Sequence, residues 1–240
     1  MSEGDSHQPK VALEAGPGLF SRVQEALALL QHTEAELSPA ALASSLSVED
    51  MVLLDLIYRH GILIEVFTLD TGRLALETYE LHQRIRECYG PMLQTYYPRA
   101  EDVERFVAAY GINGFYESIE ARQACCQARK VMPLKRALRG KRAWVTGMRR
   151  EQSVTRVQLP LRDYDQAHGL AKINPLANWR EEEVWAYIHR FEVPYNALYD
   201  QGYRSIGCAP CTRPIAAGED LRAGRWWWEQ PEHRECGLHA

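Results

Sequence analysis

The sequence lacks the features that would place it in several common classes of protein. Acidic residues number 32 against 28 lysines and arginines, and the net charge of −4 offers no basic excess for binding nucleic acid. No apolar run approaches the roughly 20 residues that a membrane-spanning helix needs. The first residues, Met1–Asp5, are polar and acidic, unlike a signal peptide. We therefore expect a cytoplasmic protein with no nucleic-acid partner and no membrane partner.

The hydrophobic pattern predicts an α/β fold. Short apolar runs, which we interpret as strands, alternate with stretches that have helical spacing. This alternation is typical of βαβ units and a mostly parallel sheet flanked by helices. The strands are expected at Ala40–Ser44, Ile62–Leu69, Pro91–Tyr97 and Ala143–Thr146. The helices are expected at Leu19–Leu37, Val48–His60 (closed by Gly61), Leu74–Tyr89, Glu101–Tyr110 and Trp179–Arg190.

Composition divides the chain into three parts. Residues 1–17 are rich in Gly, Ser, Pro and charge and read as a disordered leader. Residues 18–205 form the α/β domain, which we expect to bind a nucleotide. Residues 206–240 are dense in Gly, Pro, Cys and Trp, and we expect an irregular segment that packs on the same domain.

Ligands of parallel sheets lie beyond the carboxyl ends of the strands, and three loops fall there. Ser44–Asp50 has hydroxyls at the start of a helix, which suits an anion but also occurs on ordinary helix caps. This loop has neither the GxGxxG nor the Walker pattern, which disfavours a Rossmann site and a P-loop NTPase. Asp70–Arg73 is either a plain turn or a nucleotide contact. Arg149 and Arg150 could grip a phosphate or sulfate.

Six cysteines stand in this sequence, and a reducing compartment favours metal ligands or nucleophiles over disulfides. Two close pairs, Cys125-Cys126 and Cys208-Ala209-Pro210-Cys211, supply four thiolates. A [4Fe–4S] cluster suits adjacent cysteines best, while tetrahedral zinc and two buried apolar pairs are the alternatives. Lys130, on an expected turn after the first pair, would offset negative charge. We interpret Cys88 as a core residue of its helix.

The sixth cysteine, Cys236, lies in a polar segment near the C-terminus. Nearby His233, Arg234 and His239 could lower its pKa and raise the thiolate fraction, although an exposed terminal cysteine can also be incidental. Arg222 and Arg225 lie between the second cysteine pair and Cys236, where they could compensate a bound dianion. The tryptophans that follow them, residues 226–228, favour packing over base stacking.

Together these motifs resemble the assimilatory sulfonucleotide reductases, most closely the bacterial adenosine 5′-phosphosulfate (APS) reductases that carry an iron–sulfur cluster. The resemblance runs from about Leu37 to the C-terminus. It rests on four motifs in order, which are Cys125–Lys130, Ile206–Pro214, Gly224–Glu229 and Glu235–His239. It implies an adenine-nucleotide α-hydrolase-like fold of the PP-loop type, with Ser44–Asp50 as a modified pyrophosphatase-type loop.

The resemblance also implies a reaction in assimilatory sulfate reduction. Cys236 would attack the sulfate sulfur of APS and release AMP, and thioredoxin would then liberate sulfite from the thiosulfonate on Cys236. A non-redox [4Fe–4S] cluster would be held by Cys125, Cys126, Cys208 and Cys211. The chain would form a homo-oligomer. The expected substrate-binding residues are Ser44, Ser45, Ser47, Asp50, Asp70, Thr71, Lys130, Arg149, Arg222, Arg225 and His239.

One departure from the family concerns the phosphate loop. Relatives usually carry a Gly-Ala-Glu-Asp-like run where this chain has Ser47-Val48-Glu49-Asp50. Serine adopts a positive φ less cheaply than glycine, so the backbone contacts of the loop do not carry over from the family.

Three alternatives stay open at this point. The first is a reductase of the 3′-phosphorylated substrate (PAPS), or a dual-substrate enzyme, although members restricted to PAPS generally lack the cluster cysteines. The second is an ATP-using PP-loop enzyme such as a sulfurtransferase, which would need an SGGxDS-like loop. The third is a non-catalytic metal-binding module.

Overall fold

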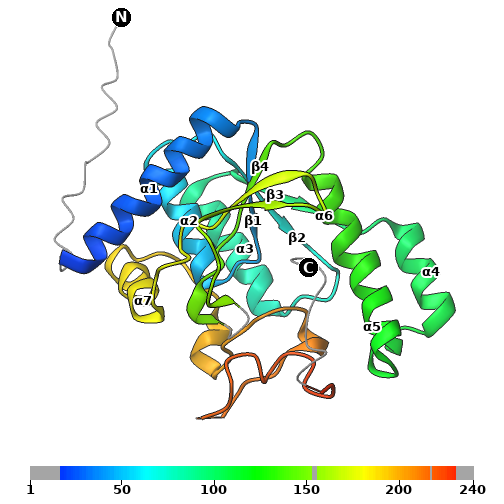
Figure 1. Cartoon of the computed structure of the whole chain (residues 1–240). Coiled ribbons are helices and arrows are strands. Elements are labelled where there is room, and N and C mark those ends of the chain that lie inside the picture. Colours follow the sequence, from blue (N-terminus) through cyan, green and yellow to red (C-terminus); the bar gives the residue numbers. More distant parts are fainter. Residues whose placement is uncertain (1–16, 153–155, 217, 231–240) are drawn as a thin grey trace, which may run out of the picture.

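The computed structural model describes residues 17–152, 156–216 and 218–230. A six-stranded sheet with the order β3-β2-β1-β4-β6-β5 runs through its centre (Figure 1). All neighbouring strands pair in parallel except β5, which pairs with β6 in antiparallel fashion. The strands are β1 (Ala40–Ser44), β2 (Glu65–Leu69), β3 (Leu93–Tyr96), β4 (Ala143–Val145), β5 (Arg162–Asp165) and β6 (Leu170–Ile173). The predicted α/β class with a mostly parallel sheet is confirmed.

Helices cover both faces of the sheet (Figure 1). They are α1 (Pro17–Leu37), α2 (Val48–Arg59), α3 (Leu76–Tyr89), α4 (Ala100–Tyr110), α5 (Ile119–Cys126), α6 (Met132–Ala137) and α7 (Glu181–Arg190). Alternation along β1 explains the two cores, because successive side chains of a strand point to opposite faces. Leu42 packs into the larger core, to which α1, α2, α3 and α7 contribute, whereas Ala41 packs into a smaller core under α6.

A buried carboxylate joins three of the helices on the larger face. Asp55 of α2 is fully buried and accepts hydrogen bonds from the hydroxyls of Tyr89 (2.9 Å) and Tyr187 (2.7 Å). It also pairs with Arg59 at 2.6 Å. Every acceptor position of this carboxylate that faces the core thus meets a donor, which offsets the cost of burying its charge.

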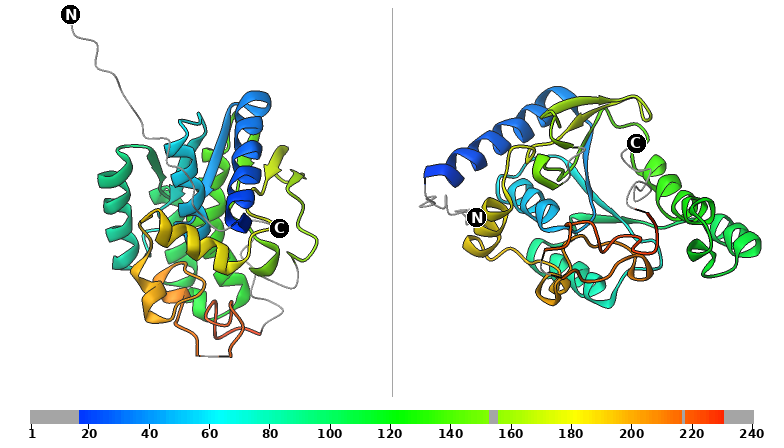
Figure 2. Two further views of the ribbon diagram at one scale, coloured as in Figure 1. Left: turned by 90° about the vertical axis from the view of Figure 1, so that its left-hand side faces the viewer. Right: turned by 60° about the horizontal axis from the view of Figure 1, so that its bottom comes forward.

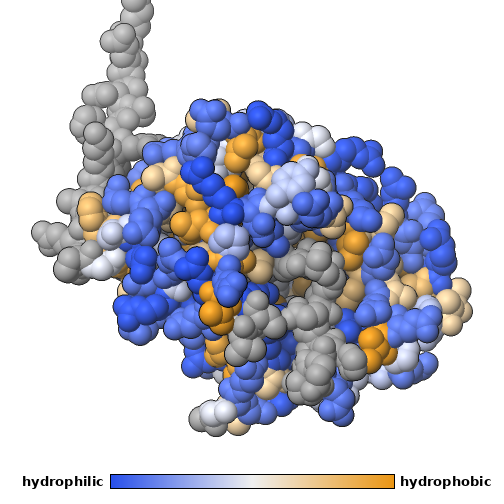
Figure 3. Space-filling view, viewed as in Figure 1, coloured by the Kyte–Doolittle hydropathy of each residue, from blue (hydrophilic) through white to orange (hydrophobic). Residues whose placement is uncertain are grey.

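The described residues between 197 and 230 run along one end of the molecule, in orange to red in both views of Figure 2. This segment contains two 3₁₀ turns, Ala197–Gln201 and Ala209–Cys211, and otherwise no regular helix or strand among its described residues. Polar residues cover most of the face seen in Figure 3, and hydrophobic residues form only a few patches there. None of the described helices has the length and apolar character to cross a membrane.

Most predicted elements fall within a few residues of the observed ones, and β1 matches its predicted bounds. Ile62 and Ile64 were expected in a strand, but the chain there still closes α2, since the Ile62 N–H bonds to the Ile57 carbonyl (3.0 Å) and Gly61 has φ +62°. The prediction of a core role for Cys88 is wrong, because its side chain is exposed. The buried residues of α3 are Thr78, Leu81, Ile85 and Tyr89, and Cys88 lies off that stripe.

Candidate active site

A cavity of about 760 Å³ opens at the carboxyl ends of β1, β2 and β4, as expected for a parallel sheet. It is lined by the phosphate loop after β1, the loops after β2 and β4, and the C-terminal segment. The structure therefore brings together parts of the chain that are up to about 180 residues apart. The predicted substrate-binding residues that line this cavity are Ser44, Ser45, Ser47, Asp50, Thr71, Lys130, Arg149, Arg222 and Arg225.

The phosphate loop turns sharply at Leu46, which has φ +62°. Ser47 has φ −69° and caps α2, because its hydroxyl accepts a hydrogen bond from the Asp50 N–H (3.3 Å). The positive φ in this loop thus falls on Leu46, and Ser47 has the ordinary conformation of a helix-capping serine.

Asp50 ties the loop after β1 to the loop after β4. One oxygen of its buried carboxylate accepts hydrogen bonds from both the backbone N–H and the hydroxyl of Ser45, each at 2.7 Å. The other oxygen accepts from the N–H of Gly147 at 3.1 Å. A Cβ at Gly147 would lie 2.4 Å from that oxygen, so only glycine permits this approach. Asp50 was predicted to bind substrate, but in this structure its carboxylate holds the two loops.

Burial raises the pKa of the Asp50 carboxyl to about 6, with nearby Glu49 adding to the effect and the hydrogen bonds from Ser45 opposing it. A carboxyl in this state changes protonation near neutral pH. The geometry of the phosphate loop is thereby linked to a proton.

Arg149 lies in the cavity wall with its guanidinium engaged by acidic side chains. It is buried, and it pairs with Glu49 of α2 at 2.9 Å and with Glu151 at 2.9 Å. The first of these ion pairs joins the loop after β4 to the first turn of α2. Arg149 was predicted to grip phosphate or sulfate; it lines the cavity, its guanidinium is bonded to carboxylates in this structure, and the substrate contact stays a prediction.

Of the two predicted substrate contacts in the loop after β2, only one lines the cavity. Asp70 does not line the cavity, because its carboxylate accepts from the Gly72 N–H (2.7 Å) and the Tyr79 hydroxyl (3.0 Å). These contacts are those of a plain turn, which was the alternative to a nucleotide contact for Asp70. Thr71 does line the cavity, and its hydroxyl lies 3.2 Å from the sulfur of Cys208. Thr71 therefore connects the sheet edge to the second cysteine pair.

The two cysteine motifs converge beside the cavity. Cys125, Cys208 and Cys211 share one cluster of packed residues with Phe106, Phe115, Ala128 and Trp226, and Cys126 follows Cys125 at the end of α5. No disulfide joins the described cysteines. The chain continues from Cys126 into a π-helical turn, Gln127–Val131, a rare geometry that is frequent at functional sites. Lys130 stands on this turn, so the expected simple turn is corrected to a π-helix.

The cysteine thiols lie in a partly buried, cationic environment. Burial raises the pKa of Cys125, and it raises that of Cys211 to about 12, with Cys208 adding to both. Arg129 and Arg73 oppose the shift at Cys125, and Lys130 and Arg225 oppose it at Cys211. In the part of the chain that the structure describes, no three His, Cys, Asp or Glu side chains are arranged to hold a metal ion.

Arg225 of the C-terminal segment and Arg122 of α5 both pack on one buried tryptophan. Trp226 is buried between the guanidiniums of Arg225 (4.6 Å to the ring centre) and Arg122 (4.8 Å), and Arg122 also pairs with Glu229 at 2.7 Å. The packing role predicted for this tryptophan is confirmed, whereas Trp227 is exposed. The catalytic residue predicted at Cys236, and His239, lie outside the described residues.

Sequence reasoning missed several cationic and aromatic residues of the cavity wall. They are Trp144, Arg156, Lys172 and Arg204. Arg156 lies six residues after Arg150, so its proximity to the Gly147–Arg150 loop was a usable signal. Trp144 lies in an expected strand, Lys172 lies outside every expected element, and no sequence signal marks either as a site residue.

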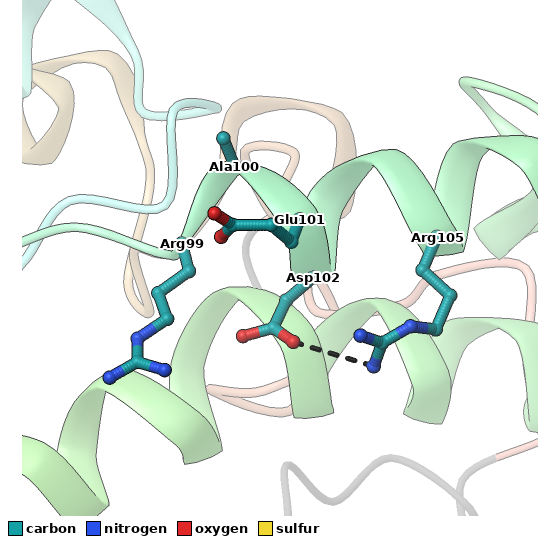
Figure 4. A pocket seen from close by; sticks show the side chains of 5 residues that line it. All are labelled: Arg99, Ala100, Glu101, Asp102 and Arg105. Carbon is teal, nitrogen blue, oxygen red and sulfur yellow. Dashed lines mark ion pairs between the residues drawn. The ribbon is translucent and has the colours of Figure 1, made fainter.

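A second, open hollow of about 460 Å³ lies at the start of α4 (Figure 4). Its charged side chains come from Arg99, Glu101, Asp102 and Arg105, and Asp102 pairs with Arg105 at 3.5 Å. None of the predicted site residues lines it.

The fold and the cavity together define a nucleotide-binding α/β protein of the PP-loop type, with a cysteine-rich wall beside the phosphate loop. Residues 39–214 match the phosphoadenosine phosphosulfate reductase domain. The chain belongs to this family of sulfonucleotide reductases.

Relatives and solved structures agree with this assignment. The chain is 54% identical to the adenosine 5′-phosphosulfate reductase of Allochromatium vinosum (98% of this chain, 91% of the relative). It is 51% identical to that of Burkholderia cepacia (93% and 89%). The structure of phosphoadenylyl-sulfate reductase from Candida auris has a TM-score of 0.69 at 27% identity (85% of this chain, 100% of that chain). Yeast FAD synthetase, with a TM-score of 0.54 at 14% identity (85% and 70%), shares the fold.

The buried carboxyl of Asp50 predicts a pH dependence of stability. Its folded-state pKa of about 6 lies above the value of about 3.9 for an unfolded aspartate, so the folded protein binds this proton more tightly. The stabilising contribution is therefore complete below about pH 4 and is lost as the pH rises through about 6. The loss corresponds to roughly 3 kcal/mol.

Urea unfolding of the wild type and of Asp50→Asn, which cannot titrate, checks this prediction. The free energy of unfolding of the wild type, relative to the variant, should fall by roughly 3 kcal/mol between about pH 4 and pH 7. Exposed Glu101 supplies a control, since Glu101→Gln should not alter the pH profile. A wild-type-to-variant difference that stays constant with pH would show that Asp50 has an ordinary pKa.

Proposed function

We propose that this protein reduces APS to sulfite and AMP in assimilatory sulfate reduction. The observation that carries the proposal is the convergence of both cysteine motifs beside the nucleotide cavity, where Cys208 and Lys130 line the same space as the phosphate loop. Relatives about 50% identical over most of the chain are named APS reductases, which supports APS as the substrate. The four cysteines favour APS over PAPS, because reductases restricted to PAPS generally lack them.

The cavity offers suitable surroundings for each part of the substrate. Phe67, Leu69 and Leu134 give an apolar wall for the adenine ring, while Ser44, Ser45 and the N–H groups at the start of α2 suit an anion. Lys130, Arg222 and Arg225 lie on the side of the cysteines, where they would neutralise the phosphosulfate. Asp50 and Arg149 would act indirectly, by holding the loops after β1 and β4 in place.

Cys236 would be the nucleophile. Its thiolate attacks the sulfate sulfur, the bond between this sulfur and the bridging oxygen breaks, and AMP leaves with the electron pair. A thiol of reduced thioredoxin then attacks the Cys236 sulfur and expels sulfite. The second thioredoxin thiol resolves the mixed disulfide, so thioredoxin is oxidised and the Cys236 thiol is restored. Thioredoxin as donor, the homo-oligomer and the cytoplasmic location remain predictions.

The chain length permits this role for Cys236. Glu229 is anchored by its ion pair with Arg122 of α5, beside the cysteine motifs. Cys236 lies seven residues further on, and seven residues of extended chain span at most about 25 Å. A nucleophile tethered at this point can reach a phosphosulfate bound beside Lys130.

Cys125, Cys126, Cys208 and Cys211 would hold a [4Fe–4S] cluster. The chemistry of the donor set fits, because Cys125, Cys208 and Cys211 share one packed cluster, Cys126 follows at the end of α5, and cationic side chains lie near these thiols. A cubane offers each thiolate a separate iron, which adjacent cysteines on one helix can satisfy more easily than the tetrahedron of a single zinc ion. The cluster would supply structure and negative charge close to the substrate, and it would not change oxidation state.

Adduct mapping tests the nucleophile. Protein purified without oxygen is incubated with APS in the absence of thioredoxin, and its peptides are examined by mass spectrometry. We expect a sulfonate on the Cys236 peptide, released on addition of reduced thioredoxin, and no adduct in Cys236→Ser. Cys88→Ser is the matched control and should keep the adduct, because Cys88 lies on the exposed face of α3. A cluster-loaded protein without an adduct would refute the mechanism.

Metal analysis tests the cofactor independently. Anaerobically purified wild type should contain about four iron atoms per chain with visible charge-transfer absorption. Cys208→Ala should lose most of the iron, while Cys88→Ala should retain it. One zinc per chain in place of iron would establish the tetrahedral alternative, and absence of both metals would support two apolar cysteine pairs.

A further inference from the structure

Lys172 is a buried lysine in the wall of the nucleotide cavity whose charge has no direct partner. It lies on β6, and only 9% of its surface is exposed. Its side chain forms no hydrogen bond and no ion pair with any residue that the structure describes. Its ammonium lies 5.2 Å from the centre of the Trp144 ring, which holds the side chain in place. Burying an ammonium without a partner is costly, so its retention calls for a ligand.

The neighbouring charges act on Lys172 in both directions, and none of the described residues forms an ion pair with it. Burial lowers the pKa of Lys172, and Arg156 lowers it further, whereas Asp165 and Asp163 act in the opposite direction. The carboxylate of Asp165 is taken by the ring nitrogen of His168 at 2.9 Å. Asp163 faces Lys172 across the strands but is exposed, and it accepts a hydrogen bond from the Tyr164 N–H. Two cations therefore stand close together beside an open space.

That space belongs to the proposed substrate site. Lys172 and Arg156 line the same cavity as Ser45 and Gly147, whose backbone N–H groups are held by Asp50. An anion placed between the two cations would relieve their repulsion and supply the missing partner of Lys172. A neutral acceptor on the base or the ribose would do this only weakly.

We propose that Lys172 is a substrate-binding residue that contacts the 5′-phosphate of the adenine nucleotide. The inference rests on the proposed function, because it takes the nucleotide to occupy this cavity. Lys172 would recognise the phosphate that substrate and product share, whereas Lys130, Arg222 and Arg225 would face the sulfate. It would thus set the affinity for the nucleotide more than the rate of attack by Cys236.

The test measures binding directly, by calorimetry with AMP and with adenosine on the cluster-loaded full chain. In Lys172→Met the affinity for AMP should fall by about 10- to 100-fold, the range expected when one charged hydrogen bond is lost. The affinity for adenosine should change by less than about twofold. Methionine keeps the shape and removes a buried unpaired charge, so the thermal stability of the ligand-free variant should be unchanged or higher.

Lys141→Met is the matched control. Lys141 is also largely buried, but it pairs with Glu65 at 2.6 Å and does not line the cavity. This variant should lose stability and bind AMP like the wild type. Equal AMP affinity in Lys172→Met and the wild type would overturn the proposal.

Two further outcomes identify other roles. Weaker binding of adenosine 3′,5′-bisphosphate with unchanged binding of AMP would assign Lys172 to a 3′-phosphate, and so also overturn the proposal. Loss of stability with proportional loss of every ligand would show a structural lysine. If the wild type itself binds neither AMP nor adenosine, the proposed function fails, which is a different result from failure at Lys172 alone.

Discussion

The site depends on one buried carboxylate that holds two loops together. Asp50 receives both donors of Ser45 and the N–H of Gly147, and these residues follow β1 and β4, which are neighbours in the sheet. The Glu49–Arg149 ion pair joins the same two parts of the chain, with Glu49 one residue before Asp50 and Arg149 two residues after Gly147. Because an unpaired buried charge would be costly, this pair of connections holds the loops after β1 and β4 together. The side chains that face the nucleotide can then come from elsewhere.

A second constraint arranges the opposite wall. The chain leaves α5 through a π-helical turn that carries Lys130, and the Cys208–Cys211 turn packs against it with Thr71 at 3.2 Å from Cys208. Arg225 stacks on buried Trp226. The backbone N–H of Trp226 donates a hydrogen bond to the Cys211 carbonyl at 3.1 Å. Cations, cysteines and the anchor of the terminal segment thus share one packed unit. This explains why the motifs occur together although about 80 residues separate the two cysteine pairs.

The sequence predicted the elements whose pattern is local. β1 begins and ends at the predicted residues, and the loops beyond the strands line the cavity as expected. The polar edge strand Arg162–Asp165 carried no apolar alternation and was not recognised. Roles that depend on distant partners were also beyond reach. Arg149 and Glu49 are 100 residues apart, so the sequence pattern could not show that this arginine is bonded to carboxylates of the protein itself. Lys172 lies on β6, a strand that the sequence pattern did not predict, and its buried charge becomes apparent only when the sheet and the cavity are assembled.

The central claim is that this cavity binds APS and that the chain reduces it with electrons from a dithiol. Product analysis under anaerobic conditions, with APS or PAPS supplied separately and reduced thioredoxin in excess, tests it most directly. The account predicts sulfite and AMP in equal amounts from APS, with much slower turnover of PAPS. Turnover of PAPS alone, or formation of AMP without sulfite, would contradict it.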